Sequence, residues 1–547
     1  MVHAKRWLFL VHRWLGVLLC VFFAMWFISG VVMMYVGYPK LTPAERLEHL
    51  PPLRTAPVAL EPAQALAAAG LHGPLQDLRL SVASAGRAVY LATPAHEAPG
   101  IRSKNARAPR PSAVVIDATT GAVLTGVDAA HALASAAAYA GPGVAMVDEG
   151  PVDEDAFTHS RALDAHRPLH RVRLDDAQGT LLYISGKTGE VVRDATRTER
   201  VWNYAGAWIH WLYPFRGNVF NTYWADIVNW LSILGIAMTI LGTVVGVMRW
   251  RFSGTYKSGR RSPYPGAMMR WHHIAGLLFA AITFTWIFSG LMSMNPWRIF
   301  DSGATPLQVE AMHGGPLSLP EQAASVQALL AASPTEVREL RWTRTAGHSL
   351  VQAHAPGHRT LLLNTASATP HTWAEGELQA AVARLLPAPV ARIDRLQAYD
   401  TYYYTRAPHT MGGSAEKPLP VLRVVFDDPQ ASWVHVDPHT GTVLNRIDRH
   451  RRVHRWLFGM LYSWDWMPLL SARPLWDMVL IVLSLGGLAI SLTGIVIGWR
   501  RVVLKMRRSR KGRPATPPKQ PEIYRHHALD GAAPTSSICS GSRNFSA

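Results

Sequence analysis

The chain of 547 residues contains few charged side chains and almost no cysteine. Charged residues make up 17% and hydrophobic residues 49%, which is too apolar for a disordered protein and too poor in charge for an ordinary cytosolic enzyme. The two cysteines, Cys20 and Cys539, exclude a disulfide framework and a cysteine metal cluster. The C-x-x-C-H motif of covalently attached haem is absent, as are the glycine-rich motifs that bind nucleotides, flavins and nicotinamides.

Four long hydrophobic runs are present, and each reaches the roughly 20 residues needed to cross a bilayer. They are Trp14–Val36, Ile227–Met248, Ile274–Met294 and Leu475–Trp499. The first is too long for the hydrophobic part of a signal peptide, and no A-x-A cleavage site follows it, so we interpret it as a retained anchor. The sequence therefore predicts a membrane protein whose four helices form a transmembrane bundle.

Positive charge lies on one side of these runs. The net charge of +18 comes almost entirely from segments 1–13, 249–270 and 500–513, which hold 17 Lys and Arg and no Asp or Glu. All three segments flank the same side of the helices, so the positive-inside rule places both termini in the cytoplasm. The charge is thus a topology signal, and nucleic acid is not expected as a partner.

This topology predicts a multi-pass protein of the bacterial inner membrane with two large periplasmic domains. The expected division is 1–36 for the cytoplasmic N-terminus and first helix, 37–223 for the first periplasmic domain, 224–249 for the second helix, 250–271 for a basic cytoplasmic loop, 272–294 for the third helix, 295–474 for the second periplasmic domain, 475–499 for the fourth helix and 500–547 for a basic cytoplasmic tail.

The two halves of the chain are similar to each other. A shift of 260 residues aligns His12 with His272 and Trp26 with Trp286 without a gap, and a shift of 251 aligns the starts of the second and fourth runs. The predicted architecture is an internal two-fold repeat, in which each half consists of a helix, an outside domain and a second helix.

The outside domains carry recurrent strand signals. Val114–Asp117, Tyr183–Ser185 and Val434–Asp437 are strand-like, and each is followed by a Thr-Gly turn and a further apolar stretch. Alanine-rich stretches such as Pro62–Gly70 and Ala129–Ala140 predict helices packed on the sheets. Both outside domains are therefore expected to be α+β.

These patterns resemble a known family. The strand–T-G-x-V–strand ends look like PepSY domains, and His12-Arg13-Trp14-Leu15-Gly16, with S-G-V-V-M-M-Y-V at the end of the same helix, is similar to PepSY-associated transmembrane proteins. Tyr402–Tyr404, Phe426–Pro429 and Asp437–Gly441 are similar to the same family, and the likeness covers about residues 5–505. Its better-understood members resemble di-haem reductases of ferric siderophores in the inner membrane. The resemblance therefore implies two haem b groups and a ferric siderophore or another ferric chelate as substrate.

Haem suits a helical bundle because facing helices can each present an imidazole to the iron. His12 and His272 match in the repeat, at the cytoplasmic starts of their helices, and are the candidate iron ligands of an inner haem. A plain alternative is that each caps a helix near the lipid headgroups. His273 competes with His272, because neighbouring helical residues point about 100° apart, and the repeat register favours His272.

His210 precedes the second hydrophobic run and His454 precedes the fourth, and both are candidate ligands of an outer haem. The repeat does not align them. With a shift of 252 residues, His210 falls on Tyr462, where members of the family often have His. Tyr can ligate ferric haem but usually lowers its potential. His454 also lies among arginines, where it could be an exposed residue at the start of a helix.

The predicted function is electron transfer through the membrane to a periplasmic ferric chelate for iron uptake, without a general acid or base. Because no flavin or nicotinamide motif is present, the electrons would come from a cytoplasmic flavoprotein or from a quinol in the lipid bilayer. The alternative is a membrane-tethered PepSY module that binds or inhibits a periplasmic protein such as a protease. Bound haem discriminates between the two.

Overall fold

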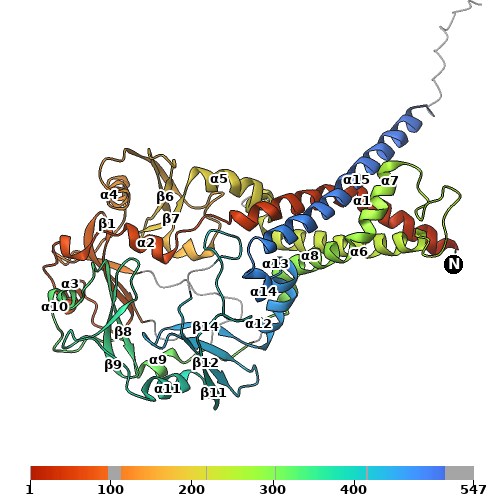
Figure 1. Cartoon of the computed structure of the whole chain (residues 1–547). Helices are drawn as coiled ribbons and strands as arrows, with labels where there is room; N and C mark the ends of the chain where they lie inside the picture. The colour runs from red at the N-terminus through yellow and green to blue at the C-terminus, as the bar shows by residue number, and fades with distance from the viewer. Residues whose placement is uncertain (1, 96–112, 217–218, 302, 414–416, 512–547) are drawn as a thin grey trace, which may run out of the picture. The chain divides into compact units, whose positions relative to one another are not determined.

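The computed structural model describes residues 2–95, 113–216, 219–301, 303–413 and 417–511 (Figure 1). Residues 96–112 and 512–547, which include Cys539 and most of the predicted basic tail, lie outside the described residues. Contacts divide the chain into Met1–Gly498 and Trp499–Ala547, and the features below belong to the first of these units.

Three helices are long and apolar enough to cross a membrane: α1 (Val2–Tyr35), α6 (Trp224–Arg249) and α15 (Leu475–Lys511). A fourth span exists only if α7 (Ala267–Leu278) and α8 (Ala280–Ser293) are counted as one, since the two meet at an angle of 66°. The sequence thus correctly predicted membrane-spanning helices, while the expected continuous helix over 274–294 is instead a bent pair.

The bend lies at Phe279, which ends α7 and begins α8 with a ψ of 13°. A side chain pressed against a neighbouring helix is a recognised cause of such breaks. The ring of Phe279 lies directly on α15 at Gly486, where an added Cβ would come within 2.3 Å of the ring. The glycine therefore makes room for the aromatic ring at the bend.

The rest of the first unit is α+β with three antiparallel sheets. The six-stranded sheet has the order β10-β9-β8-β1-β2-β3. Its strands are β1 (Leu75–Ser84), β2 (Arg87–Pro94), β3 (Val114–Asp117), β8 (Glu339–Thr345), β9 (His348–His354) and β10 (Leu361–Asn364). Because β1 pairs with β8, at Leu78 opposite Trp342, segments from both expected outside domains share this one sheet.

Two four-stranded sheets have the same simple order, each strand pairing with the next along the chain. One consists of β4 (Met146–Val152), β5 (Leu169–Leu174), β6 (Leu181–Ser185) and β7 (Val191–Ala195). The other consists of β11 (Val390–Leu396), β12 (Val421–Phe426), β13 (Trp433–Val436) and β14 (Val443–Ile447).

The expected strand–turn–strand units are confirmed at β6–β7 and β13–β14. After β3 the unit shrinks to a single bridge between Ile116 and Val123. In each turn a side chain at the end of the first strand accepts backbone N–H groups, as Asp117 does from Thr119 and Thr120. The glycine of the turn then has a positive φ, 71° at Gly441, which explains the recurrent Thr-Gly pair.

Short helices cover the sheets. The alanine-rich stretches form α3 (Pro62–Ala68) and α4 (Ala129–Ala140), as expected. The largest core packs α3 and α10 against the six-stranded sheet through Leu66, Leu80 and Leu329. The remaining α-helices are α2 (Pro43–His49), α5 (Arg197–Asn203), α9 (Val309–His313), α10 (Val326–Ala331), α11 (Glu377–Val382), α12 (Arg449–His454), α13 (Leu461–Ser463) and α14 (Met467–Leu470).

Two π-helical segments connect the four-stranded sheets to the apolar helices. They are η3 (Tyr204–Trp208), which follows α5, and η8 (Arg455–Met460), which follows α12. Each leads to a residue in the left-handed conformation, Leu212 with a φ of 54° and Trp464 with a φ of 50°. The chain reverses there before it enters α6 or α15, so each segment delivers its side chains to the ends of the apolar helices.

Candidate functional site

A cavity of about 490 Å³ lies where α1, α6, α8 and α15 meet the two π-helical segments. This volume is within the usual range of sites for small molecules and cofactors. Most of the wall is apolar, and the conspicuous lining residues are five tryptophans and four methionines: Trp26, Trp211, Trp224, Trp286, Trp476, Met33, Met34, Met294 and Met411. His210, Tyr462 and Arg406 bring nitrogen and oxygen groups to it.

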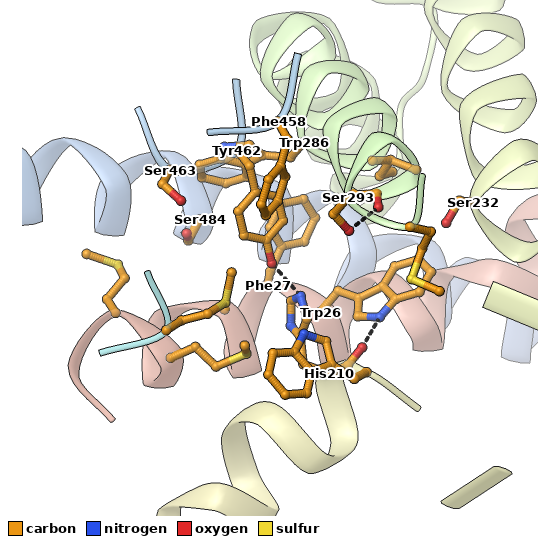
Figure 2. Close-up of a pocket in the computed structure, with 18 of the residues that line it drawn as sticks. Trp26, Phe27, His210, Ser232, Trp286, Ser293, Phe458, Tyr462, Ser463 and Ser484 are labelled. Carbon is orange, nitrogen blue, oxygen red and sulfur yellow. Dashed lines mark hydrogen bonds between the residues drawn. The ribbon is translucent and has the colours of Figure 1, made fainter. Parts of the chain in front are cut away.

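His210 projects into this cavity from the segment that follows η3 and is held there from α1 (Figure 2). Its Nδ1 lies 2.8 Å from Ser29 Oγ, and its backbone carbonyl accepts a 3.0 Å hydrogen bond from Trp26 Nε1. Gly30 lies beneath the ring, where an added Cβ would be 3.7 Å from Cε1. Burial lowers the pKa of His210 to about 4, so the imidazole is neutral at pH 7.

The hydrogen bonds fix which nitrogen of His210 carries the proton. Ser29 Oγ donates to the carbonyl of Met25 at 2.6 Å, so it accepts from Nδ1–H of His210. Nε2 is then the nitrogen with the lone pair, and it lies 2.6 Å from the hydroxyl of Tyr462, which donates to it. This is the arrangement of a metal-binding histidine, whose other nitrogen is hydrogen-bonded to an orienting group.

His12 and His272 lie elsewhere on the apolar helices, and neither lines the cavity. His12 Nδ1 lies 3.2 Å from the carbonyl of Met238 on α6, and His272 Nδ1 lies 3.2 Å from the carbonyl of Ile490 on α15. The two imidazoles are near enough to interact electrostatically. Within the described residues neither Nε2 makes a hydrogen bond, so both are left for another partner.

A glycine of the neighbouring helix makes room for each of these rings. A Cβ at Gly242 would lie 2.6 Å from Cε1 of His12, and a Cβ at Gly494 would lie 3.4 Å from Cε1 of His272. Both imidazoles therefore lie against bare helix backbone, at glycines 252 residues apart in the sequence.

The model of the PepSY-associated TM region matches residues 9–363, which is more than half of the chain. The chain belongs to this family. The match begins within α1 and ends in β10, so it includes His12, His210 and His272. No curated protein shows significant similarity to this PepSY-associated TM protein.

His273 and His454 make different contacts. Both nitrogens of His273 are engaged, Nδ1 with Ser262 Oγ at 2.8 Å and Nε2 with the carbonyl of Gly246 at 2.9 Å. It fastens the loop between α6 and α7, which favours His272 as the candidate ligand. His454 packs against Phe300 and Phe458, with ring centroids 4.7 and 5.5 Å apart, and does not line the cavity.

Sequence analysis of this PepSY-associated TM protein did not identify Arg406 and Asp465. Arg406 lines the cavity, lies 3.2 Å from Asp465 and has its guanidinium 5.1 Å from the ring centre of Trp476. Tyr404 donates to the other carboxylate oxygen of Asp465 at 2.7 Å. Loop residues with neither motif nor periodicity carry no signal of this kind, although the run Tyr402–Tyr404 marks the place.

The donor set of the cavity fits haem. An anchored neutral histidine with an available Nε2 is a common axial ligand, and the aromatic walls suit a flat apolar ring. His12 and His272 also fit as ligands, since each has Nδ1 engaged and Nε2 available. The described residues contain no cluster of three or more His, Cys, Asp or Glu able to hold a bare metal ion.

Proposed function

We propose that this PepSY-associated TM protein is a haem-containing electron-transfer protein of the bacterial inner membrane that reduces a periplasmic ferric siderophore or another ferric chelate. The observation that carries the proposal is His210, which is fixed by Ser29 and directs Nε2 into a cavity of about 490 Å³. Such second contacts orient metal-binding histidines and typically change metal affinity about 10–100-fold.

The proposed topology has four transmembrane helices, with α7 and α8 forming one bent span. The loop between α6 and α7 is basic, as is the start of the chain, and the positive-inside rule places both in the cytoplasm. Both termini would then be cytoplasmic, and the three sheets would lie in the periplasm. On this arrangement the cavity lies toward the periplasmic ends of the helices, while His12 and His272 lie toward the cytoplasmic ends.

The proposed two-fold repeat has support from contacts that recur 252 residues apart. The pairs Trp224–Trp211 and Trp476–Ser463 are equivalent, and in each the indole donates to a carbonyl, at 2.8 and 3.0 Å. The two π-helical segments, the left-handed residues that follow them and the two four-stranded sheets recur at the same spacing. A repeat would place His12 and His272 at equivalent depths, as a shared inner haem requires.

In this proposal, haem supplies one-electron chemistry when it is bound. The chain's own residues bind and orient: His12 and His272 would hold the inner group and His210 the outer one. The tryptophans and methionines of the cavity exclude water. Reduction of a ferric chelate weakens its hold on the metal, because hard oxygen ligands bind the less highly charged ferrous ion less tightly. The electrons would come from a cytoplasmic flavoprotein or a quinol.

The first experiment is an absorbance spectrum of the full chain, purified in detergent after expression with sufficient haem, in the oxidised and dithionite-reduced states. The pyridine haemochrome method then counts haem per chain. We expect two b-type haems, and about half of that content in His12→Ala or His210→Ala. Protein that folds but carries no haem would refute electron transfer and leave the tethered binding module.

Ser29 allows a finer test with a matched control. Ser29→Ala removes the group that orients His210, so we expect the outer site to need about 10–100-fold more haem for half-occupancy than in the wild type. Ser289→Ala removes a hydroxyl that bonds only within its own helix, to the carbonyl of Trp286 at 3.0 Å. Equal haem loss in the two variants would contradict the orienting role of Ser29.

A further inference from the structure

The two side chains that face each other in the cavity are of different kinds, although they occupy equivalent positions 252 residues apart. His210 comes from the segment after η3, and Tyr462 comes from the segment after η8. They are joined by a single 2.6 Å hydrogen bond between Nε2 and the hydroxyl (Figure 2). Any ligand on Nε2 must replace this hydrogen bond, so one of the two side chains has to move aside.

The surrounding contacts show which side chain is fixed. On α1, Trp26 donates to the backbone carbonyl of His210, and Ser29 accepts from its ring. The equivalent residues of α8 make neither contact with Tyr462. Trp286 Nε1 is buried with no hydrogen-bond partner among the described residues, and Ser289 bonds only within α8. His210 is therefore held in place from two directions, whereas the one hydrogen bond of the Tyr462 hydroxyl within the described part of the chain is to His210.

His454 does not replace the missing second histidine. Its ring packs edge-on against Phe300 and contacts Phe458, and it is absent from the cavity wall. Phe458 does line the cavity and contacts Tyr462, with ring centroids 5.3 Å apart. The aromatic ring thus lies between His454 and the space in front of His210.

We propose that the outer site has His210 as its one protein ligand to haem iron and that the Tyr462 side of the cavity is an exchangeable ligand position for small neutral molecules of the carbon monoxide and nitric oxide class. The inference rests on the proposed function. Tyr462 moves aside and keeps its hydroxyl as a hydrogen-bond donor, and Trp286 Nε1, which has no partner among the described residues, is a second donor. The inner site differs, since equivalent histidines approach it from both halves.

The test uses the haem-loaded full chain and does not depend on reductase activity. Haem per chain is counted first, and the dithionite-reduced protein is then titrated with carbon monoxide and followed by difference spectroscopy. We expect one of the two haems to form a carbon monoxide complex in the wild type. Tyr462→His places a nitrogen ligand at the open position and should abolish the complex without lowering the haem count. Tyr462→Phe should retain the complex with an altered carbon monoxide stretching frequency, because a hydrogen-bond donor is lost.

His454→Gln separates the two possible arrangements of the outer site. We expect its carbon monoxide complex to equal that of the wild type. Two haems per chain without any complex in the wild type, or a complex that forms only in His454→Gln, would overturn the inference and leave the proposed function intact. A complex of equal size in Tyr462→His would overturn it as well. Protein without haem would instead refute the proposed function itself.

Discussion

Helix α15 contacts α1 at Gly494, and this contact predicts how one added methyl group changes stability. A Cβ at Gly494 would lie 2.5 Å from Cys20 Sγ, whereas ordinary contact begins at 3.4 Å, an overlap of about 0.9 Å. Overpacking of this kind typically costs about 1–3 kcal/mol. The better helix propensity of alanine offsets about 0.5–1 kcal/mol. Gly494→Ala should therefore destabilise the protein by about 1–2 kcal/mol.

A second substitution should relieve the overlap. Cys20→Ala removes the sulfur and alone leaves a small cavity worth roughly 1 kcal/mol. In the double variant the Cβ added at position 494 occupies space that the sulfur has vacated, so the double variant should be more stable than the sum of the single effects by about 1–2 kcal/mol. Gly276→Ala is the matched control, because nothing lies within 4 Å of its added Cβ, and it should be neutral or slightly stabilising.

The assay is thermal unfolding of the detergent-purified full chain, followed by tryptophan fluorescence. A change of about 1 kcal/mol corresponds to about 2–4 °C for a cooperative unit of roughly 150–250 residues. Gly494→Ala should therefore unfold several degrees below the wild type, and the double variant should recover most of this loss. Strictly additive effects, or a Gly276→Ala variant that loses as much as Gly494→Ala, would refute the close approach of the two helices.

Two further predictions concern charge pairs outside the apolar helices. Hydrogen bonds from Glu199 and then Glu45 raise the pKa of His409 to about 9 against burial, so its stabilisation is complete below pH 6.5 and is lost as the pH rises to about 9. Because His409 is 38% exposed, screening leaves about 1 kcal/mol; His409→Gln should lower the melting temperature at about pH 6 but not at about pH 10, and equal losses would contradict this. Glu339 is only 6% exposed and pairs with two arginines, so Glu339→Gln should cost about 3 kcal/mol in urea unfolding. Glu336→Gln, at a side chain that is 63% exposed, should cost less than about 0.5 kcal/mol, and similar losses in the two variants would count against the buried network.

Local patterns predict much of this fold because their causes are local. The turns after β6 and β13 follow from a polar side chain that accepts turn N–H groups and a glycine with positive φ, and both features are visible in a short stretch of sequence. The alanine-rich helices and the apolar spans are equally recognisable, since each depends on the composition of neighbouring residues.

Features that depend on distant partners were not predicted. The pairing of β1 with β8 joins strands about 260 residues apart, and neither strand carries a signal that specifies its neighbour. The bend between α7 and α8 depends on Phe279 meeting Gly486, so no pattern within residues 267–293 indicates it. Arg406 reaches the cavity through its pairing with Asp465, which lies in another loop.

The candidate site combines both kinds of information. The repeat register places position 210 opposite position 462, but it does not show which nitrogen of His210 is left for a ligand. That depends on Ser29, whose hydroxyl donates to the carbonyl of Met25 and must therefore accept from Nδ1–H. The imidazole is a property of the sequence, whereas the direction of its lone pair is a property of the packing of α1 against the segment after η3. It follows that Ser29, which contributes no ligand atom, should control haem occupancy at His210 more strongly than His454, which has an imidazole but no access to the cavity.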